Sequence, residues 1–233
     1  MKEKYPIRIN HYLAIKKYST RRGGDELIKK GLIKINGKIA NLGDKVFEKD
    51  KVEFLRQEQK ESYVYYAYNK PINIVTNNPQ IGEKSILNSI KTKEKIFPIG
   101  RLDKDSRGLI ILTNDGRITD KILNPKFYHE KEYLVKVNKP ITDIFMRQMR
   151  DGVRMGKETT LKCKVRRVEK DSFEIILTEG KNRQIRRMCR SLNYDVKDLI
   201  RERVMNIKLG NLKTGQLRKI EKKELEEFLK NSL

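Results

Sequence analysis

The chain has 233 residues, and its 54 Lys and Arg against 31 Asp and Glu give a formal net charge of +23. Hydrophobic residues make up 37%, enough for the core of one large domain or two unequal ones, but no run of about 18 apolar residues is present, which excludes a membrane-spanning helix. Two cysteines are too few for a disulfide scaffold and the start of the chain has no apolar signal region, so we expect a cytoplasmic protein.

The positive charge indicates a polyanionic partner, most simply a nucleic acid, because Lys and Arg release counterions when they neutralise phosphates. The alternative is a lysine-rich surface without a specific partner, since 35 of the 54 basic residues are Lys. The way in which basic residues cluster along the chain distinguishes a nucleic-acid partner from a surface that is merely rich in lysine.

Residues 1–58 are predicted to form a separate small module of helices and a β-hairpin. Apolar residues recur at helical spacing over 9–13. Ser19 or Thr20 is the expected cap of a second helix, which buries residues 27–28.

The hairpin is predicted at Asn36-Gly37, because this pair lies between two apolar runs and both central positions of a tight hairpin turn need a positive φ. Alternation over 52–54 adds a last short strand to the module. The polar stretch 56–62 is the predicted linker, and residues 63–233 are the expected second domain.

The second domain mixes strands with helices, which indicates an α+β fold with a mixed, mainly antiparallel sheet. Strands are predicted at 63–68, 109–112, 133–137, 161–166 and 173–177. Helices are predicted at 141–150, 184–192 and 222–230.

The most informative stretch is 180–192, which predicts a helix with two opposed faces. Its apolar stripe consists of Ile185, Met188, Cys189 and Leu192. Its basic stripe, which lies roughly 160° away at 100° per residue, consists of Arg183, Arg186, Arg187 and Arg190. Planar guanidinium groups bind phosphate bidentately, and no acidic residue interrupts the stretch, so the basic face is predicted to bind an anion.

Asp103 lies in a loop before an apolar run, with basic residues on both sides. Neighbouring arginine favours its ionised form, which makes it a candidate nucleophile or electrostatic stabiliser, although an aspartate in a loop is more often a turn former. Tyr133 is either a core aromatic or a surface on which a base stacks.

Metal and cofactor sites are not expected from the pattern of residues. His11 and His129 are the only histidines, and neither has a Cys or carboxylate at ligand spacing. No glycine pattern for a nucleotide cofactor is present.

Four motifs at 69–71, 100–116, 131–135 and 182–188 together resemble the RsuA/RluB/RluE/RluF family of ribosomal RNA pseudouridine synthases. The N-terminal module is similar to the small RNA-binding domain first seen in a small-subunit ribosomal protein. It departs from that pattern at Gly23-Gly24, where each glycine costs roughly 1 kcal/mol inside a helix, so we expect the second helix to begin late.

Within this family the chain is most similar to the RluF type, on residues 129–135, 162–165 and 203–206. The resemblance implies a cofactor-independent isomerase that acts on large-subunit ribosomal RNA and, in some members, on a transfer RNA. We expect a monomer without a membrane partner. The alternative is a non-catalytic RNA-binding factor in ribosome assembly, which leaves Asp103 unexplained.

The resemblance also implies residue roles. Asp103 is the essential carboxylate, as nucleophile or as base, and Arg186 pairs with it, while Tyr133 stacks on the uracil. Arg101 occupies space near the flipped base. The residues expected to contact RNA are Arg101, Arg183, Arg187 and Arg190 of the second domain and Arg8, Arg21, Arg22, Lys29 and Lys30 of the first.

Overall fold

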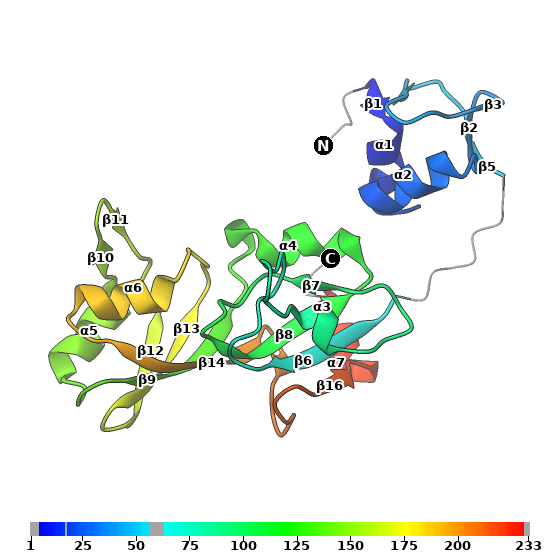
Figure 1. Ribbon diagram of the computed structural model, residues 1–233. Helices are drawn as coiled ribbons and strands as arrows, with labels where there is room; N and C mark the ends of the chain where they lie inside the picture. The colour runs from blue at the N-terminus through cyan, green and yellow to red at the C-terminus, as the bar shows by residue number, and fades with distance from the viewer. Residues whose placement is uncertain (1–4, 17, 56–62, 231–233) are drawn as a thin grey trace. The chain divides into compact units, whose positions relative to one another are not determined.

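A computed structural model describes residues 5–16, 18–55 and 63–230 (Figure 1). The chain divides into two compact units, one of residues 1–63 with the segment 115–117, and one of residues 64–114 and 118–233. The predicted linker 56–62 lies outside the described residues. The domain bounds 1–58 and 63–233 therefore stay a prediction.

The first unit has two helices against short strands, as predicted. Ile9, Leu13, Ile28 and Ile33 form the centre of its core. The turn at Asn36-Gly37 has the positive φ angles, 51° and 81°, that the hairpin requires. Its elements are β1 (Ile7–Arg8), α1 (Ile9–Ile15), α2 (Arg21–Lys29), β2 (Ile33–Ile35), β3 (Lys38–Ile39), β4 (Lys45–Val46) and β5 (Val52–Phe54).

The second helix, α2, begins at Arg21, so the expected late start is wrong. Thr20 caps it, and its hydroxyl accepts a hydrogen bond from the backbone N–H of Gly23 at 3.0 Å. Gly24 is buried against α1, where an added Cβ would lie 3.2 Å from the Leu13 side chain. The glycine therefore lets the two helices approach closely, and this packing outweighs its low helix propensity.

The second unit is built on a mixed sheet, which in the described part of the chain has nine strands in the order β12-β13-β9-β14-β8-β6-β16, with β15 on β14 and β7 on β8. Its strands are β6 (Tyr65–Lys70), β7 (Phe97–Ile99), β8 (Arg107–Thr113), β9 (Lys131–Val137), β12 (Lys164–Glu169), β13 (Ser172–Leu177), β14 (Val196–Val204), β15 (Ile207–Lys208) and β16 (Leu217–Lys219), with the separate hairpin β10 (Arg154–Met155) and β11 (Glu158–Thr159). Its helices are α3 (Ile86–Ser89), α4 (Thr119–Leu123), α5 (Asp143–Asp151), α6 (Gln184–Ser191) and α7 (Lys222–Lys230), with 3₁₀ turns η1 (Gly116–Ile118) and η2 (Pro125–Phe127).

The pairing is antiparallel except between β14 and β8, which are parallel and align Ile200 with Arg107 and Arg201 with Gly108. This confirms the predicted α+β class with a mixed, mainly antiparallel sheet. The central strand β14 was not among the predicted strands. It brings the β9 half of the sheet next to the β8 half.

Two hydrophobic clusters hold the second unit together. Helices α5 and α6 lie at the end of the sheet that contains β9, β12 and β13, and α7 lies at the other end, beside β6 and β16 (Figure 1). The predicted apolar stripe of α6 is confirmed, since Ile185, Met188 and Cys189 are buried in the cluster with Phe145 and Phe173. The second cluster joins β6, β8 and α3 around Tyr68.

The predicted strand at 161–166 is displaced, because β12 begins only at Lys164. Leu161 is 50% exposed, and the Cys163 thiol donates to the carbonyl oxygen of Met149 at 3.1 Å. Strand β12 lies at one edge of the sheet and, among the described residues, pairs with β13 alone, so its side chains are mostly exposed rather than half-buried.

Among the residues that the structure describes, no helix is both long and apolar enough to cross a bilayer.

Candidate active site

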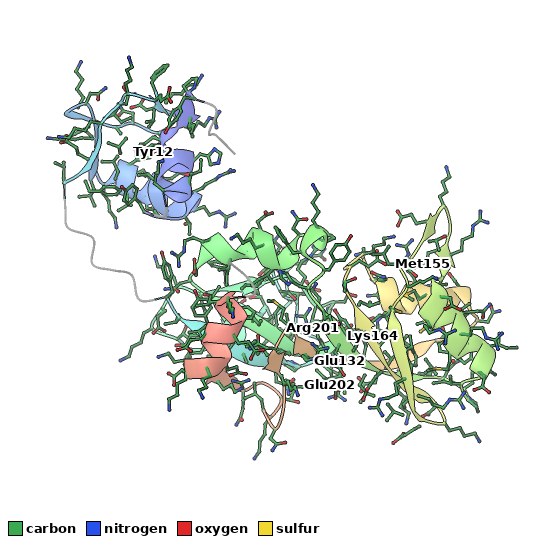
Figure 2. All side chains as sticks on the ribbon, turned by 180° about the vertical axis from the view of Figure 1, so that it is seen from behind. Tyr12, Glu132, Met155, Lys164, Arg201 and Glu202 are labelled. Carbon is green, nitrogen blue, oxygen red and sulfur yellow. The ribbon has the colours of Figure 1, made fainter. Side chains whose placement is uncertain are left out.

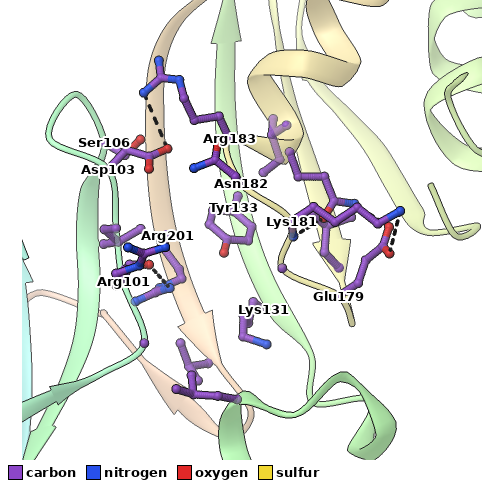
Figure 3. A pocket seen from close by; sticks show the side chains of 18 of the residues that line it. Arg101, Asp103, Ser106, Lys131, Tyr133, Glu179, Lys181, Asn182, Arg183 and Arg201 are labelled. Atoms are coloured by element: carbon purple, nitrogen blue, oxygen red, sulfur yellow. Dashed lines mark hydrogen bonds and ion pairs between the residues drawn. The ribbon is translucent and has the colours of Figure 1, made fainter. Parts of the chain in front are cut away.

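A cleft of about 470 Å³ opens in the second unit, and segments far apart in the sequence line it (Figure 3). Arg101 and Asp103 come from the loop between β7 and β8. Tyr133 comes from β9, residues 177–186 come from the end of β13 and the start of α6, and Arg201 comes from β14. Three of the four sequence motifs thus contribute side chains to one cavity.

The backbone around Asp103 is held from both sides. On the preceding residue, Leu102, the N–H donates to the Thr76 hydroxyl at 3.0 Å, and the same hydroxyl donates to the Leu102 carbonyl at 2.7 Å. The backbone N–H of Ser106 donates to the Asp103 carbonyl at 3.1 Å, which closes a turn. The Asp103 side chain is 35% exposed and faces the cleft (Figure 3).

Lys70, the last residue of β6, anchors the far side of this turn. It is completely buried, and its ammonium donates to the carbonyl oxygens of Pro71 at 2.9 Å and Ser106 at 2.8 Å. Burial lowers its pKa to about 8, against the opposing pull of Asp103 and Asp105. The first sequence motif therefore supports the turn that carries Asp103, without lining the cleft.

The expected pair between Arg186 and Asp103 is wrong. Arg183 is the arginine near Asp103, with its Nη1 3.7 Å from Asp103 Oδ2. Both arginines instead hold Asp105, since Arg183 Nη2 and Arg186 Nε lie 2.7 Å and 3.3 Å from its Oδ2. The periodic stripe of α6 does not reveal which of two acids on the facing loop each arginine meets.

The α6 arginines adopt this arrangement because of how the helix begins. Arg183 is its N-cap, in a left-handed conformation with φ 47°, and the side chain is 44% exposed at the rim. Arg186 lies one turn further along, and its side chain is only 14% exposed. The paired Arg183 guanidinium holds the pKa of the Asp105 carboxyl below its usual range, chiefly through their hydrogen bonds.

A buried carboxylate fixes the turn that leads into α6. Glu179 is 9% exposed, and its Oε1 accepts from Gln184 Nε2 at 2.6 Å and from the backbone N–H of Leu161 at 3.1 Å. Lys181 Nζ lies 3.7 Å from the other carboxylate oxygen. These contacts fix the position from which the Arg183 side chain projects at the end of the turn.

Alternate residues of β9 point into the cleft. Lys131 and Tyr133 line it, and Figure 3 shows the Tyr133 ring between Arg183 on one side and Lys131 on the other. Burial first, and then the charge of Arg201, lowers the pKa of Lys131 to about 8. Its ammonium donates to the carbonyl oxygen of His129 at 3.3 Å.

The intervening residue of β9, Glu132, accepts from Arg203 Nε at 2.6 Å. Figure 2 shows Glu132 and Glu202 close together on the central part of the sheet. Burial, and then the charges of Glu174 and Glu132, raises the pKa of Glu202. Glu132, unlike Lys131 and Tyr133 beside it in β9, does not line the cleft, because successive side chains of a strand point to opposite faces of the sheet.

Arg201 is a cleft residue that the sequence reasoning missed. It is only 4% exposed, and its Nε donates to the Leu109 carbonyl at 2.7 Å, while its Nη1 is 3.4 Å from the Arg101 carbonyl. It therefore ties β14 to the loop that presents Arg101. No local pattern marks it, because it lies in a strand of mixed charge.

The expected RNA-contacting residues fall into two groups. Arg101, Arg187 and Arg190 are exposed on the second unit, and the α6 arginines line a depression of about 220 Å³ that also contains Asp105 and Asp195. The group on the first unit is exposed as well, and consists of Arg8, Arg21, Arg22, Lys29 and Lys30. Across the described residues, no group of three or more His, Cys, Asp or Glu is arranged to hold a metal ion.

Residues 64–191, which include most of the residues that line this cleft, match the family of RNA pseudouridylate synthases, and residues 7–52 match the S4 domain. The chain therefore belongs to the RNA pseudouridylate synthase family. It is an RNA pseudouridine synthase, an isomerase that converts uridine to pseudouridine. The family, the enzyme class and the fold class predicted from the sequence are confirmed, and the non-catalytic alternative is disfavoured.

Named relatives support this assignment over more than nine tenths of the chain. The chain is 41% identical to the dual-specificity RNA pseudouridine synthase RluF of Escherichia coli strain K12, covering 96% of this chain and 79% of the relative. It is 34% identical to the ribosomal large subunit pseudouridine synthase B of Bacillus subtilis, covering 91% of each. A crystal structure of a pseudouridylate synthase superposes with a TM-score of 0.71 at 27% identity, covering 95% of this chain and 99% of that one.

Proposed function

We propose that the substrate is large-subunit ribosomal RNA, with a transfer RNA as an alternative or additional substrate, and that the protein acts as a cytoplasmic monomer. The proposal is supported by the relatives' names, since one is a ribosomal large subunit synthase and another is a dual-specificity enzyme. The S4 match and the net charge of +23 are consistent with a large folded RNA.

The reaction breaks the bond between N1 of uracil and C1′ of the ribose, turns the base, and joins C5 to C1′. The C5 proton is removed and N1 gains one, so no net oxidation or hydrolysis occurs. The target nucleotide has to leave its stack to reach a cleft, at a cost of a few kcal/mol. A volume of about 470 Å³ is sufficient for one flipped nucleotide.

Asp103 is the proposed essential carboxylate, acting on the sugar as nucleophile or on its proton as base. The single observation that carries this role is its position in the cleft on a turn fixed by Lys70 and Thr76, with Arg183 3.7 Å away. Either role requires a carboxylate oxygen that is free towards the ribose, and the Arg183 contact is too long to be a hydrogen bond. In this account Arg186 acts through Asp105 and does not contact Asp103.

Tyr133 is proposed to stack on the uracil, and its hydroxyl to take part in removal of the ring proton. Arg101, exposed at the same cleft, is proposed to occupy space near the flipped base. Arg183, Arg187 and Arg190 are proposed to bind the phosphates that flank the target.

The test is pseudouridine mapping on transcripts of large-subunit ribosomal RNA and of transfer RNAs, incubated with the wild-type protein and with Asp103→Asn. We expect one or a few new pseudouridines on the ribosomal transcript with wild type only. Modification of transfer RNA alone would overturn the large-subunit assignment. Sedimentation of the free protein tests the monomer, which a dimer at assay concentration would refute.

A further inference from the structure

Two acids of the same turn compete for one guanidinium. Arg183 makes a two-point contact with Asp105, with Nη1 at 3.1 Å from Oδ1 and Nη2 at 2.7 Å from Oδ2. The same Nη1 lies 3.7 Å from Oδ2 of Asp103, which is within ion-pair range but too long for a hydrogen bond. The arginine is thus committed to Asp105 and only near Asp103.

Asp105 itself is held in place by the next arginine of the helix. The Arg186 guanidinium donates from Nη2 to the Asp105 backbone carbonyl at 2.7 Å and to the Ser106 hydroxyl at 3.3 Å. Its Nη1 donates to the Val196 carbonyl at 3.3 Å, and its Nε is 3.3 Å from the Asp105 carboxylate. Arg186 is mostly buried and contacts several fixed acceptors. It therefore holds Asp105 in place even when the exposed Arg183 side chain moves.

The distance between Arg183 and Asp103 matters for chemistry. A guanidinium that pairs bidentately with a carboxylate occupies both of its oxygens. Asp103, used as nucleophile or base, needs at least one oxygen free towards the ribose. At 3.7 Å the Arg183 guanidinium makes no hydrogen bond to Asp103, so the carboxylate oxygens stay available to the ribose.

We propose that Asp105 is a positioning residue that holds the guanidinium of Arg183 at the edge of the cleft and prevents it from closing on Asp103. This rests on the proposed catalytic role of Asp103. Without the Asp105 carboxylate, Arg183 pairs directly with Asp103, the only other acid that the structure places within ion-pair range of its guanidinium among the described residues. The enzyme then binds RNA but reacts slowly.

The first test is the full-length variant Asp105→Asn, assayed by pseudouridine formation on the transcript that wild type modifies. We expect kcat to fall at least tenfold with KM changed less than about threefold, because the defect lies in the reactive carboxylate. The pair is largely exposed, so the melting temperature should stay within about 4 °C of wild type.

The matched control is Asp151→Asn, which removes a similarly exposed acid with a two-point arginine contact outside the cleft. The Asp151 side chain is 49% exposed against 46% for Asp105, and it accepts from Arg150 at 3.0 Å and 3.3 Å. We expect its kcat to equal that of wild type. An Asp105→Asn variant with wild-type kcat would overturn the proposal.

The decisive experiment is the double variant Asp105→Asn/Arg183→Gln. If Asp105 acts by restraining Arg183, removing the arginine frees Asp103 again, and kcat of the double variant exceeds that of Asp105→Asn several-fold. A purely structural role gives a double variant that is no faster than the single one, which would refute the proposal. Asp103→Asn in the same series tests the underlying role separately, since retained activity there overturns the function of Asp103 whatever the Asp105 variants do.

Discussion

Gly108 pairs with Arg201 where the strands β8 and β14 run parallel, and Gly108→Ala tests whether the two strands approach as closely there as the structure shows. The residue has φ +105°, and an added Cβ would lie 2.7 Å from the backbone nitrogen of Arg201 and still closer to its carbonyl oxygen. The Ile200 side chain lies 3.0 Å away. Because the nearest atoms are backbone in the middle of a sheet, they cannot turn aside as a flexible side chain does.

The expected cost has two parts. An alanine at positive φ costs about 1–2 kcal/mol, and overpacking against a rigid neighbour costs about 1–3 kcal/mol more, so we expect the free energy of unfolding to fall by about 2–5 kcal/mol. Gly156→Ala is the matched control, because Gly156 has φ +69° with nothing within 4 Å of an added Cβ. The free energy of unfolding of Gly156→Ala should fall only by the cost of placing an alanine at positive φ.

The assay is urea denaturation of both variants and the wild type, combined with kcat below the transition. A shift of the Arg201 backbone moves the guanidinium that donates to the Leu109 carbonyl and approaches the Arg101 carbonyl, so kcat of Gly108→Ala should fall as well. If Gly108→Ala destabilises no more than Gly156→Ala, the close approach of the two strands is refuted.

The remaining predictions concern the buried lysine, the cleft tyrosine and the first unit. Burial lowers the pKa of Lys70 from 10.5 to about 8, so the unfolded state binds more protons than the folded state between these two pH values. Urea denaturation should therefore show that the wild type gains stability relative to Lys70→Met as pH rises through that range. A stability difference that does not change with pH counts against a buried ammonium that donates to the Ser106 carbonyl. Tyr133→Phe should keep KM within about threefold and lower kcat at least tenfold, whereas equal kcat would show that only the stacking face matters. Arg21→Gln/Arg22→Gln should reduce the slope of log Kd against log salt concentration by roughly one to two, and an unchanged slope excludes phosphate contacts by these residues.

Periodic features were predictable from the sequence because one face of each element is buried. In α6 the buried residues Ile185, Met188 and Cys189 follow the helical repeat, and the hairpin at Asn36-Gly37 has the backbone angles that its residues favour. In both cases the local pattern and the tertiary packing demand the same structure.

Strand β14 escaped prediction because five of its nine residues are charged. Its charges are satisfied by partners distant in sequence, since Asp198 Oδ2 lies 2.6 Å from Arg107 Nη2 and Arg203 Nε lies 2.6 Å from Glu132 Oε2. Ion pairing across the sheet replaces the apolar alternation that identifies an ordinary strand. Local alternation of apolar residues therefore does not identify this segment as a strand.

The site was predictable as a set of residues but not as a set of contacts. The sequence motifs identified the loop of Asp103, the strand of Tyr133 and the helix of Arg186, and the structure places side chains from all three at one cleft. The pairing of Arg186 and Arg183 with Asp105 depends on the docking of α6 against that loop, which no spacing along the chain encodes.

We propose above all that Asp103 is the catalytic carboxylate of this RNA pseudouridine synthase. The most direct measurement is the yield of pseudouridine by Asp103→Asn on an RNA that the wild type modifies, together with the Kd of both proteins for that RNA. We predict no detectable product and an equal or tighter Kd, because the substitution removes a negative charge from a basic surface. Product formation at a rate near that of wild type would contradict the account.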